Sequence, residues 1–229
     1  MIAAAGLALA LVAPAAAAPA IDWDPIFFYG PGITATFSPV GDTLVGVGTV
    51  SHFGPPLEFL NPLISPPGPN EYTIYVRALT SLGTTTSGPP AFTFYSTNYS
   101  GGTIAIFEDT TPDGSFDPNP PNAGVPGDFA DGTLILYGTF SNFYTQVDNF
   151  STKNTGNAEG TIAWTGGSLL PLTGDANVKS CPGLFTGGIT FYPPVMIPGY
   201  VYRDDGKIDF NCPTPAVNST WGKIKSSYR

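Results

Sequence analysis

The residue types that most often carry catalysis are scarce in this chain. His52 is the only histidine, so any Ser–His–Asp or Cys–His arrangement has to use it, and no G-x-S-x-G nucleophile motif occurs. Glycoside hydrolysis needs two carboxylates at a fixed separation. Glu58, Glu71 and Glu159 are candidates for a general acid, but their spacing singles out no pair. We therefore expect a protein that is not an enzyme, and a secreted hydrolase is the less favoured alternative.

One acidic segment has the spacing of a metal site. Asp109, Asp113 and Asp117 recur at every fourth position, so a looping backbone could bring three carboxylate oxygens to one Ca²⁺. The segment lacks the glutamate at the twelfth position of an EF-hand loop, and a solvated acidic loop is the alternative reading. Calcium is the one cofactor that the sequence suggests.

Aromatic side chains could bind a carbohydrate. Trp23 and Trp164 are candidate platforms for stacking on sugar rings, which would make the chain a carbohydrate-binding module. The same rings could instead fill the core of the domain.

The two cysteines, Cys181 and Cys212, predict one disulfide in an exported protein. Closing a loop of this size contributes about 3 to 4 kcal/mol in the chain-entropy model. Two buried thiols or a metal pair are the alternatives.

Residues 1–20 run from an apolar stretch into small residues, which is typical of a secretory signal peptide. The unbroken apolar run before Pro14 is shorter than the roughly 20 residues that cross a bilayer. Cleavage after Ala17 or after Ala20 fits the small-x-small pattern. We expect a mature chain without a transmembrane segment, secreted or held at the cell surface.

The last residues predict a short helix. Trp221, Ile224 and Tyr228 share one apolar face behind a candidate N-cap at Ser219. This C-terminal helix could dock on the domain or act as a sorting tag.

Composition favours an all-β fold, because 28 glycines, 25 prolines and only 11% charged residues suit short strands and turns. Period-two alternation supports this, and Asp205-Gly206 predicts a hairpin turn. We predict a single antiparallel β-sandwich domain over residues 21–229. The predicted strands are 33–37, 43–53, 72–78, 91–95, 103–107, 133–140, 161–164, 188–192 and 200–203.

An internal repeat is a further hypothesis. Residues 43–53 match residues 133–143 at six of eleven positions. Duplicated halves over 33–108 and 131–211, joined by a proline-rich loop at 109–130, would explain this echo. Convergence of strand-forming patterns is the alternative.

Net charge limits the partners. The chain carries −9, and no lysine or arginine lies between Arg77 and Lys153. Nucleic acid and anionic lipid are therefore poor partners, whereas polysaccharide and other envelope proteins are not excluded.

Several motifs resemble exported bacterial β-rich proteins of the PEP-CTERM-like kind. They are the alanine-rich leader, Thr111-Pro112-Asp113-Gly114, Asn119-Pro120-Pro121-Asn122, Asp131-Gly132-Thr133-Leu134 and Thr220-Trp221-Gly222-Lys223-Ile224-Lys225. The resemblance implies an envelope or matrix component associated with exopolysaccharide. The family's VPxP motif, apolar segment and basic cluster are not found at the end of this chain, so sorting by that route is not expected. We expect a structural or adhesive role without catalysis.

Overall fold

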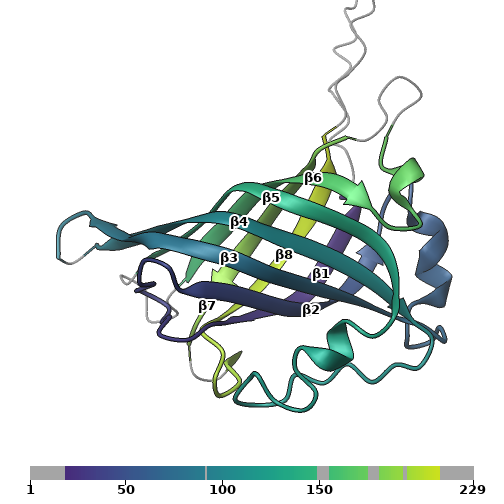
Figure 1. Ribbon diagram of the computed structural model, residues 1–229, viewed down its shortest axis with the longest axis horizontal. Coiled ribbons are helices and arrows are strands. Elements are labelled where there is room, and N and C mark those ends of the chain that lie inside the picture. The colour runs from purple at the N-terminus through teal and green to yellow at the C-terminus, as the bar shows by residue number, and fades with distance from the viewer. Residues whose placement is uncertain (1–18, 91, 149–154, 175–180, 193–194, 212–229) are drawn as a thin grey trace, which may run out of the picture.

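The computed structural model describes residues 19–90, 92–148, 155–174, 181–192 and 195–211. Eight strands dominate this part of the chain, together with three short 3-10 helices (Figure 1). The strands are β1 (Ile21–Tyr29), β2 (Thr43–Phe53), β3 (Glu71–Ser87), β4 (Phe94–Asp109), β5 (Thr133–Asp148), β6 (Thr155–Gly166), β7 (Gly183–Thr190) and β8 (Tyr202–Phe210). The helices are η1 (Glu58–Leu63), η2 (Gly127–Phe129) and η3 (Leu170–Leu172). Each strand pairs antiparallel with the next, and β8 also pairs with β1, so the sheet closes into a barrel.

The predicted β-sandwich is wrong, although the all-β composition of the fold is confirmed. Residues 21–28 of β1 pair with residues 202–208 of β8, and this pairing closes the sheet. Alternation with period two is the same in a sandwich and in a barrel, because each strand buries one face in both. Pairing between the first and last strands leaves no local pattern in the sequence.

One local prediction at this seam is also wrong, and one strand there was not predicted. The Asp-Gly pair in residues 203–209 does not form a hairpin turn, because the chain runs straight through it as β8. Residues 21–29 form β1, which was not predicted because Asp22, Asp24 and Pro25 interrupt its apolar pattern. A register shift between Trp23 and Ile26 accommodates the proline in the strand.

Most other predicted strands exist but are longer than their alternation indicates. The runs at 72–78 and 103–107 belong to β3 and β4, which have 17 and 16 residues. Residues 33–37 are the exception, since they contribute only an isolated bridge between Thr34 and Phe37.

Inward-facing side chains fill the barrel. Among the largest that are less than 2% exposed are Trp23, Phe28, Phe53, Tyr72, Phe143, Phe185 and Tyr202. Trp23 stacks on Phe185 with ring centroids 4.5 Å apart. Eight strands enclose a space just wide enough for side chains. The described interior is therefore a packed core.

The proline-rich loop at 109–130 packs against the outside of the barrel and contributes no strand. Val125 and Phe129 lie buried against Phe27 and Val47 in a second apolar cluster. The loop is therefore fixed to the outer faces of β1 and β2, and Figure 1 shows it running below these strands.

The internal repeat can be placed on the strands of the barrel. The echo between 43–53 and 133–143 relates β2 to β5, which lies three strands further along the barrel. Equivalent halves of an eight-stranded barrel would relate strands four apart. Residues 33–108 hold β2, β3 and β4, and residues 131–211 begin with β5, so duplication and convergence both stay hypotheses for the echo.

Several predictions fall outside the described residues. These are the leader up to residue 18, Cys212, and the C-terminal helix with Trp221, Ile224 and Tyr228. Cys181 is described and fully buried, and its disulfide with Cys212 stays a prediction. Within the described residues, no helix is long and apolar enough to cross a membrane.

Ala20 belongs to the barrel. Its N–H donates to the carbonyl of Ile208 at 2.9 Å, and its carbonyl accepts from the N–H of Gly54 at 3.1 Å. Removal of residues 1–17 would keep both hydrogen bonds, whereas removal of residues 1–20 would break them. The leader itself stays a prediction, and the two cleavage positions expected from the sequence differ in whether they would leave these hydrogen bonds in place.

A chain that begins at Ile21 is expected to unfold at a lower temperature than one that begins at Ala18. It lacks the two hydrogen bonds of Ala20, each worth about 1 kcal/mol net. Thermal unfolding followed by circular dichroism measures the difference. Equal melting temperatures would show that Ala20 does not contribute to the barrel.

Candidate functional site

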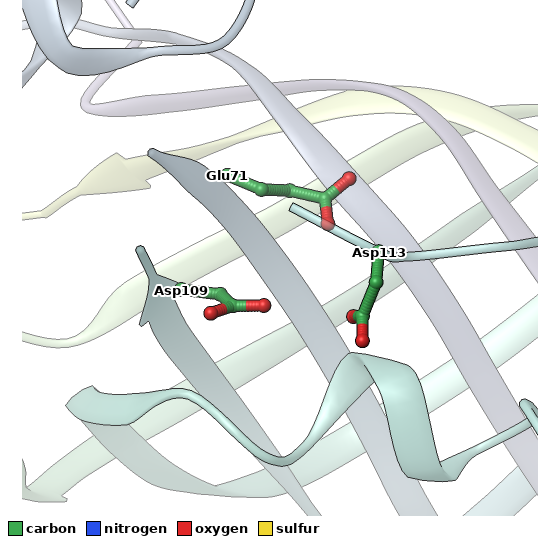
Figure 2. Close-up of side chains that lie close together, drawn as sticks. All are labelled: Glu71, Asp109 and Asp113. Carbon is green, nitrogen blue, oxygen red and sulfur yellow. The ribbon is translucent and has the colours of Figure 1, made fainter. Parts of the chain in front are cut away.

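Three carboxylates meet at one end of β3 and β4. Glu71 begins β3, Asp109 ends β4, and these two residues lie directly opposite each other in the antiparallel register. Asp113 reaches them from the loop after β4, and one oxygen of each group lies within 4.8 Å of the others (Figure 2). Like charges placed opposite each other on neighbouring strands are destabilising. A bound cation would relieve this repulsion.

The structure changes the membership of the predicted calcium site. Asp109 and Asp113 come together, but the third carboxylate is Glu71 rather than Asp117. Asp117 instead accepts a hydrogen bond from the hydroxyl of Ser115 at 2.8 Å. Glu71 escaped the sequence analysis because it lies 38 positions before Asp109. Recognising that these residues flank one hairpin would have revealed it.

The electrostatics and the ligand types fit a hard cation. Lost hydration raises the pKa of Asp113, and the negative charges of Asp131, Asp128 and Asp109 raise it further. Carboxylate oxygens are the ligands that Ca²⁺ prefers. Two of the oxygens also anchor the loop, because Glu71 accepts from the Gly114 N–H at 2.9 Å and Asp109 from the Thr111 N–H at 2.8 Å.

Calcium is expected to raise the melting temperature of the protein, and Asp113→Asn is expected to reduce that rise. The substitution removes one negative ligand and keeps the size of the side chain. The matched control is Asp117→Asn, which should leave the calcium response unchanged because Asp117 lies outside the three-carboxylate group. Differential scanning calorimetry with calcium and with a chelator measures both. An equal response in all three proteins would show that calcium acts elsewhere.

The predicted stacking platforms lie in the core. Trp23 is 0% exposed and Trp164 is 4% exposed. Trp164 packs edge-on against Phe210 with ring centroids 6.1 Å apart. Neither ring can stack on a ligand from solvent in this structure, so the alternative, that they fill the core, is correct.

A buried acid lies beside Trp23 inside the barrel. Asp204 of β8 has no exposed surface, and its Oδ2 accepts a hydrogen bond from the indole Nε1–H of Trp23 at 3.1 Å. Its Oδ1 has no hydrogen-bond partner among the described residues. The pKa of Asp204 is raised to about 7, chiefly by burial; the Trp23 hydrogen bond and Arg203 lower it, and the charge of Asp205 raises it. Sequence analysis missed Asp204 because it assigned this segment to a turn.

Stability is expected to fall as pH rises through the range in which Asp204 loses its proton. The pKa of Asp204 is about 7 in the folded chain, against 3.8 for a freely solvated aspartate. The folded state therefore holds this proton more tightly, and its contribution to stability is full below about pH 4 and is lost above about pH 7.

The variant Asp204→Asn should lack this decline. At ~1.4 kcal/mol per pKa unit, the decline amounts to about 4 kcal/mol. Urea unfolding at a series of pH values measures it, and Asp131→Asn, an exposed acid, is the control. Parallel stability curves for the wild type and Asp204→Asn would contradict the assignment.

A shallow groove with polar side chains along its edges crosses the outer wall from β6 to β1. Its volume is about 440 Å³, and it is lined by Pro19, Asp22, Asn157, Glu159, Thr186, Gly187, Gly188, Asp205, Gly206 and Lys207. We call it the glycine groove. The register arranges its outward residues in two rows across the strands, Asn157–Gly188–Asp205 and Glu159–Thr186–Lys207–Asp22. Donors and acceptors therefore face solvent on both sides of a floor without side chains.

The glycines of the groove differ in what requires them. A Cβ on Gly187 would lie 2.1 Å from Oδ2 of Asp204, and one on Gly206 would lie 2.3 Å from the Thr186 carbonyl oxygen. Both positions are therefore closed to larger residues by packing. A Cβ on Gly188 would approach nothing closer than the carbonyl oxygen of Asp205 at 3.7 Å. Packing does not explain the glycine at 188.

The rim of the groove carries charge and one aromatic ring. Desolvation and the charge of Asp24 raise the pKa of Asp205, and Arg203 lowers it. Tyr144 of β5 lies opposite Glu159 and extends its row. The amide of Asn157 donates to Glu159 at 3.0 Å, which orients both side chains beside the floor.

The remaining candidate residues are scattered. His52 is exposed on β2, Glu58 is exposed in η1, and Glu71 and Glu159 belong to the acidic group and the groove, respectively. The structure brings no two of these four residues together as a catalytic pair.

Fold and site define a closed eight-stranded antiparallel barrel with a packed interior and a groove edged by polar side chains on its outer wall. Comparison of the chain with protein-family models, with curated proteins and with solved structures finds no match. The resemblance to PEP-CTERM-like proteins therefore stays a prediction.

Proposed function

We propose that this protein is a non-catalytic, exported adhesive component of the cell envelope that binds polysaccharide in the glycine groove. The observation that carries the proposal is Gly188, which leaves the floor open although the fold does not require a glycine there. A sugar ring fits a flat floor with polar edges because its hydroxyls pair with amides and carboxylates there. Asn157 and Asp205 flank Gly188 in register and supply both kinds of group.

The charges favour a neutral polymer. Asp22, Glu159 and Asp205 line the groove, and Lys207 is its one cation. Lys207 also forms an ion pair with Asp209 at 2.8 Å. An anionic polysaccharide would meet a negative field, whereas a neutral one would not. Tyr144, which is half-buried and accepts a hydrogen bond from the Asn157 amide at 3.4 Å, lies at the end of one row and could contact a further sugar unit.

The position of the most perturbed acid supports binding without catalysis. A hydrolase needs a protonated carboxyl that can reach its substrate. Asp204 has its pKa raised to about 7, but it is fully buried and lies on the inner side of the wall, beneath Gly187. The acids that line the groove lie on the opposite side of the sheet.

Gly188→Val is expected to abolish binding without damaging the fold. The valine side chain would fill the floor, and its Cβ has room. Affinity electrophoresis through a panel of neutral and anionic polysaccharides measures binding as retardation. We expect one neutral polymer to retard the wild type and the valine variant to bind at least about tenfold more weakly, which corresponds to ~1.4 kcal/mol.

The control for this substitution is Thr139→Val, which adds the same side chain to an exposed position on β5. It should bind like the wild type. Equal retardation of the Gly188 variant and the wild type would place binding outside the groove, and no retardation by any polymer would remove the proposal. Repeating the gels with a chelator separates a role of the acidic group from binding in the groove.

A further inference from the structure

The β3–β4 hairpin continues beyond the barrel wall. The β2–β3 ladder ends at the pair Thr43 and Thr80, whereas the β3–β4 ladder continues to the pair Ser87 and Phe94. Figure 1 shows this hairpin projecting from one end of the barrel. The last residues of β3 therefore extend past β2, the strand that pairs with the other edge of β3.

Only the beginning of this extension is covered. Asp42 and Gly41 exchange backbone hydrogen bonds with Ser81, and the Ser38 N–H donates to the hydroxyl of Thr84 at 2.8 Å. Within the described part of the chain, residues 85–87 pair with β4 alone. The edge of residues 85–87 that faces away from β4 is exposed, and we call it the β3 edge.

The β3 edge is short, and its three residues include no charged side chain, proline or bulge. Natural sheets guard such edges with lysine, proline or a bulge, because unpaired N–H and C=O groups attract another strand. Residues 85–87 are Thr, Thr and Ser, all exposed, and the β3 bulge lies before them between Ser81 and Thr84. The edge is thus regular, uncharged and open to solvent.

Charge selects the strand that could pair there. The chain carries −9 overall, but residues 78–107 contain no charged side chain. Two copies of this chain repel each other over most of their surface, whereas the described carboxylates that flank the β3 edge are Asp42, beside Ser81, and Asp148, opposite Phe94 on β5. Exposed apolar side chains lie beside the hairpin, including Val40 at 75% and Leu82 at 57% exposure, and Val40 contacts the Gly83 position.

We infer that the β3 edge binds a second copy of this chain, with the two edges pairing antiparallel about a two-fold axis. Such an interface uses the same patch on both partners, so pairing closes at a dimer. The unpaired N–H and C=O groups of each edge would bond to those of the other. A lipid surface could not pair with them in this way. The inference does not depend on polysaccharide binding, because the groove lies on β6, β7, β8 and β1.

Charges introduced at the β3 edge test the dimer. In one variant Thr85 and Thr86 both become lysine, and in a second variant both become glutamate. An antiparallel two-fold pairing centred on the edge places like charges opposite each other in either variant. We expect the wild type to reach the mass of a dimer with rising concentration in sedimentation velocity. Each variant alone should stay a monomer, and an equimolar mixture of the two should form a heterodimer.

The control is the variant Thr139→Lys with Ser141→Lys, two exposed positions on β5. It adds the same charge and should dimerise like the wild type. A wild type that stays monomeric at every concentration would overturn the inference, and co-sedimentation of that monomer with neutral lipid vesicles would assign the hairpin to a membrane surface instead. Dimerisation of the lysine variant by itself would place the interface elsewhere.

Discussion

The barrel depends on a seam between strands at opposite ends of the chain. Trp23 and Asp204 stand 181 positions apart, and the indole N–H of one donates to the carboxyl of the other inside the closed sheet. The large ring faces Gly206 in register, and the carboxyl occupies the space beneath Gly187. Burial of a carboxyl with one unpaired oxygen costs stability, and the raised pKa keeps the group largely uncharged below neutral pH.

The seam also shapes the outer wall. Gly187 and Gly206 are required by what lies inside, and side chains alternate between the two faces of a strand. The size of the outward side chains next to these glycines then determines whether the outer wall is flat or carries a groove. Gly188 follows Gly187 on β7 and faces outward. Because it has no side chain, the floor of the groove stays open there. A structural need on one face and an open floor on the other therefore occur in two neighbouring residues of β7, Gly187 and Gly188.

The parts that sequence analysis predicted are those with local patterns. Alternation predicted most strands, and prolines predicted the loop before β5. Closure of the barrel was not predictable, because β1 is interrupted by Pro25 and pairs with a strand read as a turn. The acidic group was found in part, since Asp109 and Asp113 are close in sequence, whereas Glu71 reaches them only through strand pairing. Trp23 was misread because a tryptophan can lie in a core or on a binding surface. Which face of the strand it occupies distinguishes the two, and the sequence did not show this.

The two ends of β3 and β4 have opposite character. One end gathers Glu71 and Asp109, and the other is the uncharged hairpin. β3 has 17 residues, which at about 3.3 Å per residue separates the ends by on the order of 50 Å. This is several times the Debye length of about 8 Å at physiological salt. The charge at the acidic end is therefore screened from the β3 edge, so neutralising it with a cation does not decide whether two copies can approach each other there.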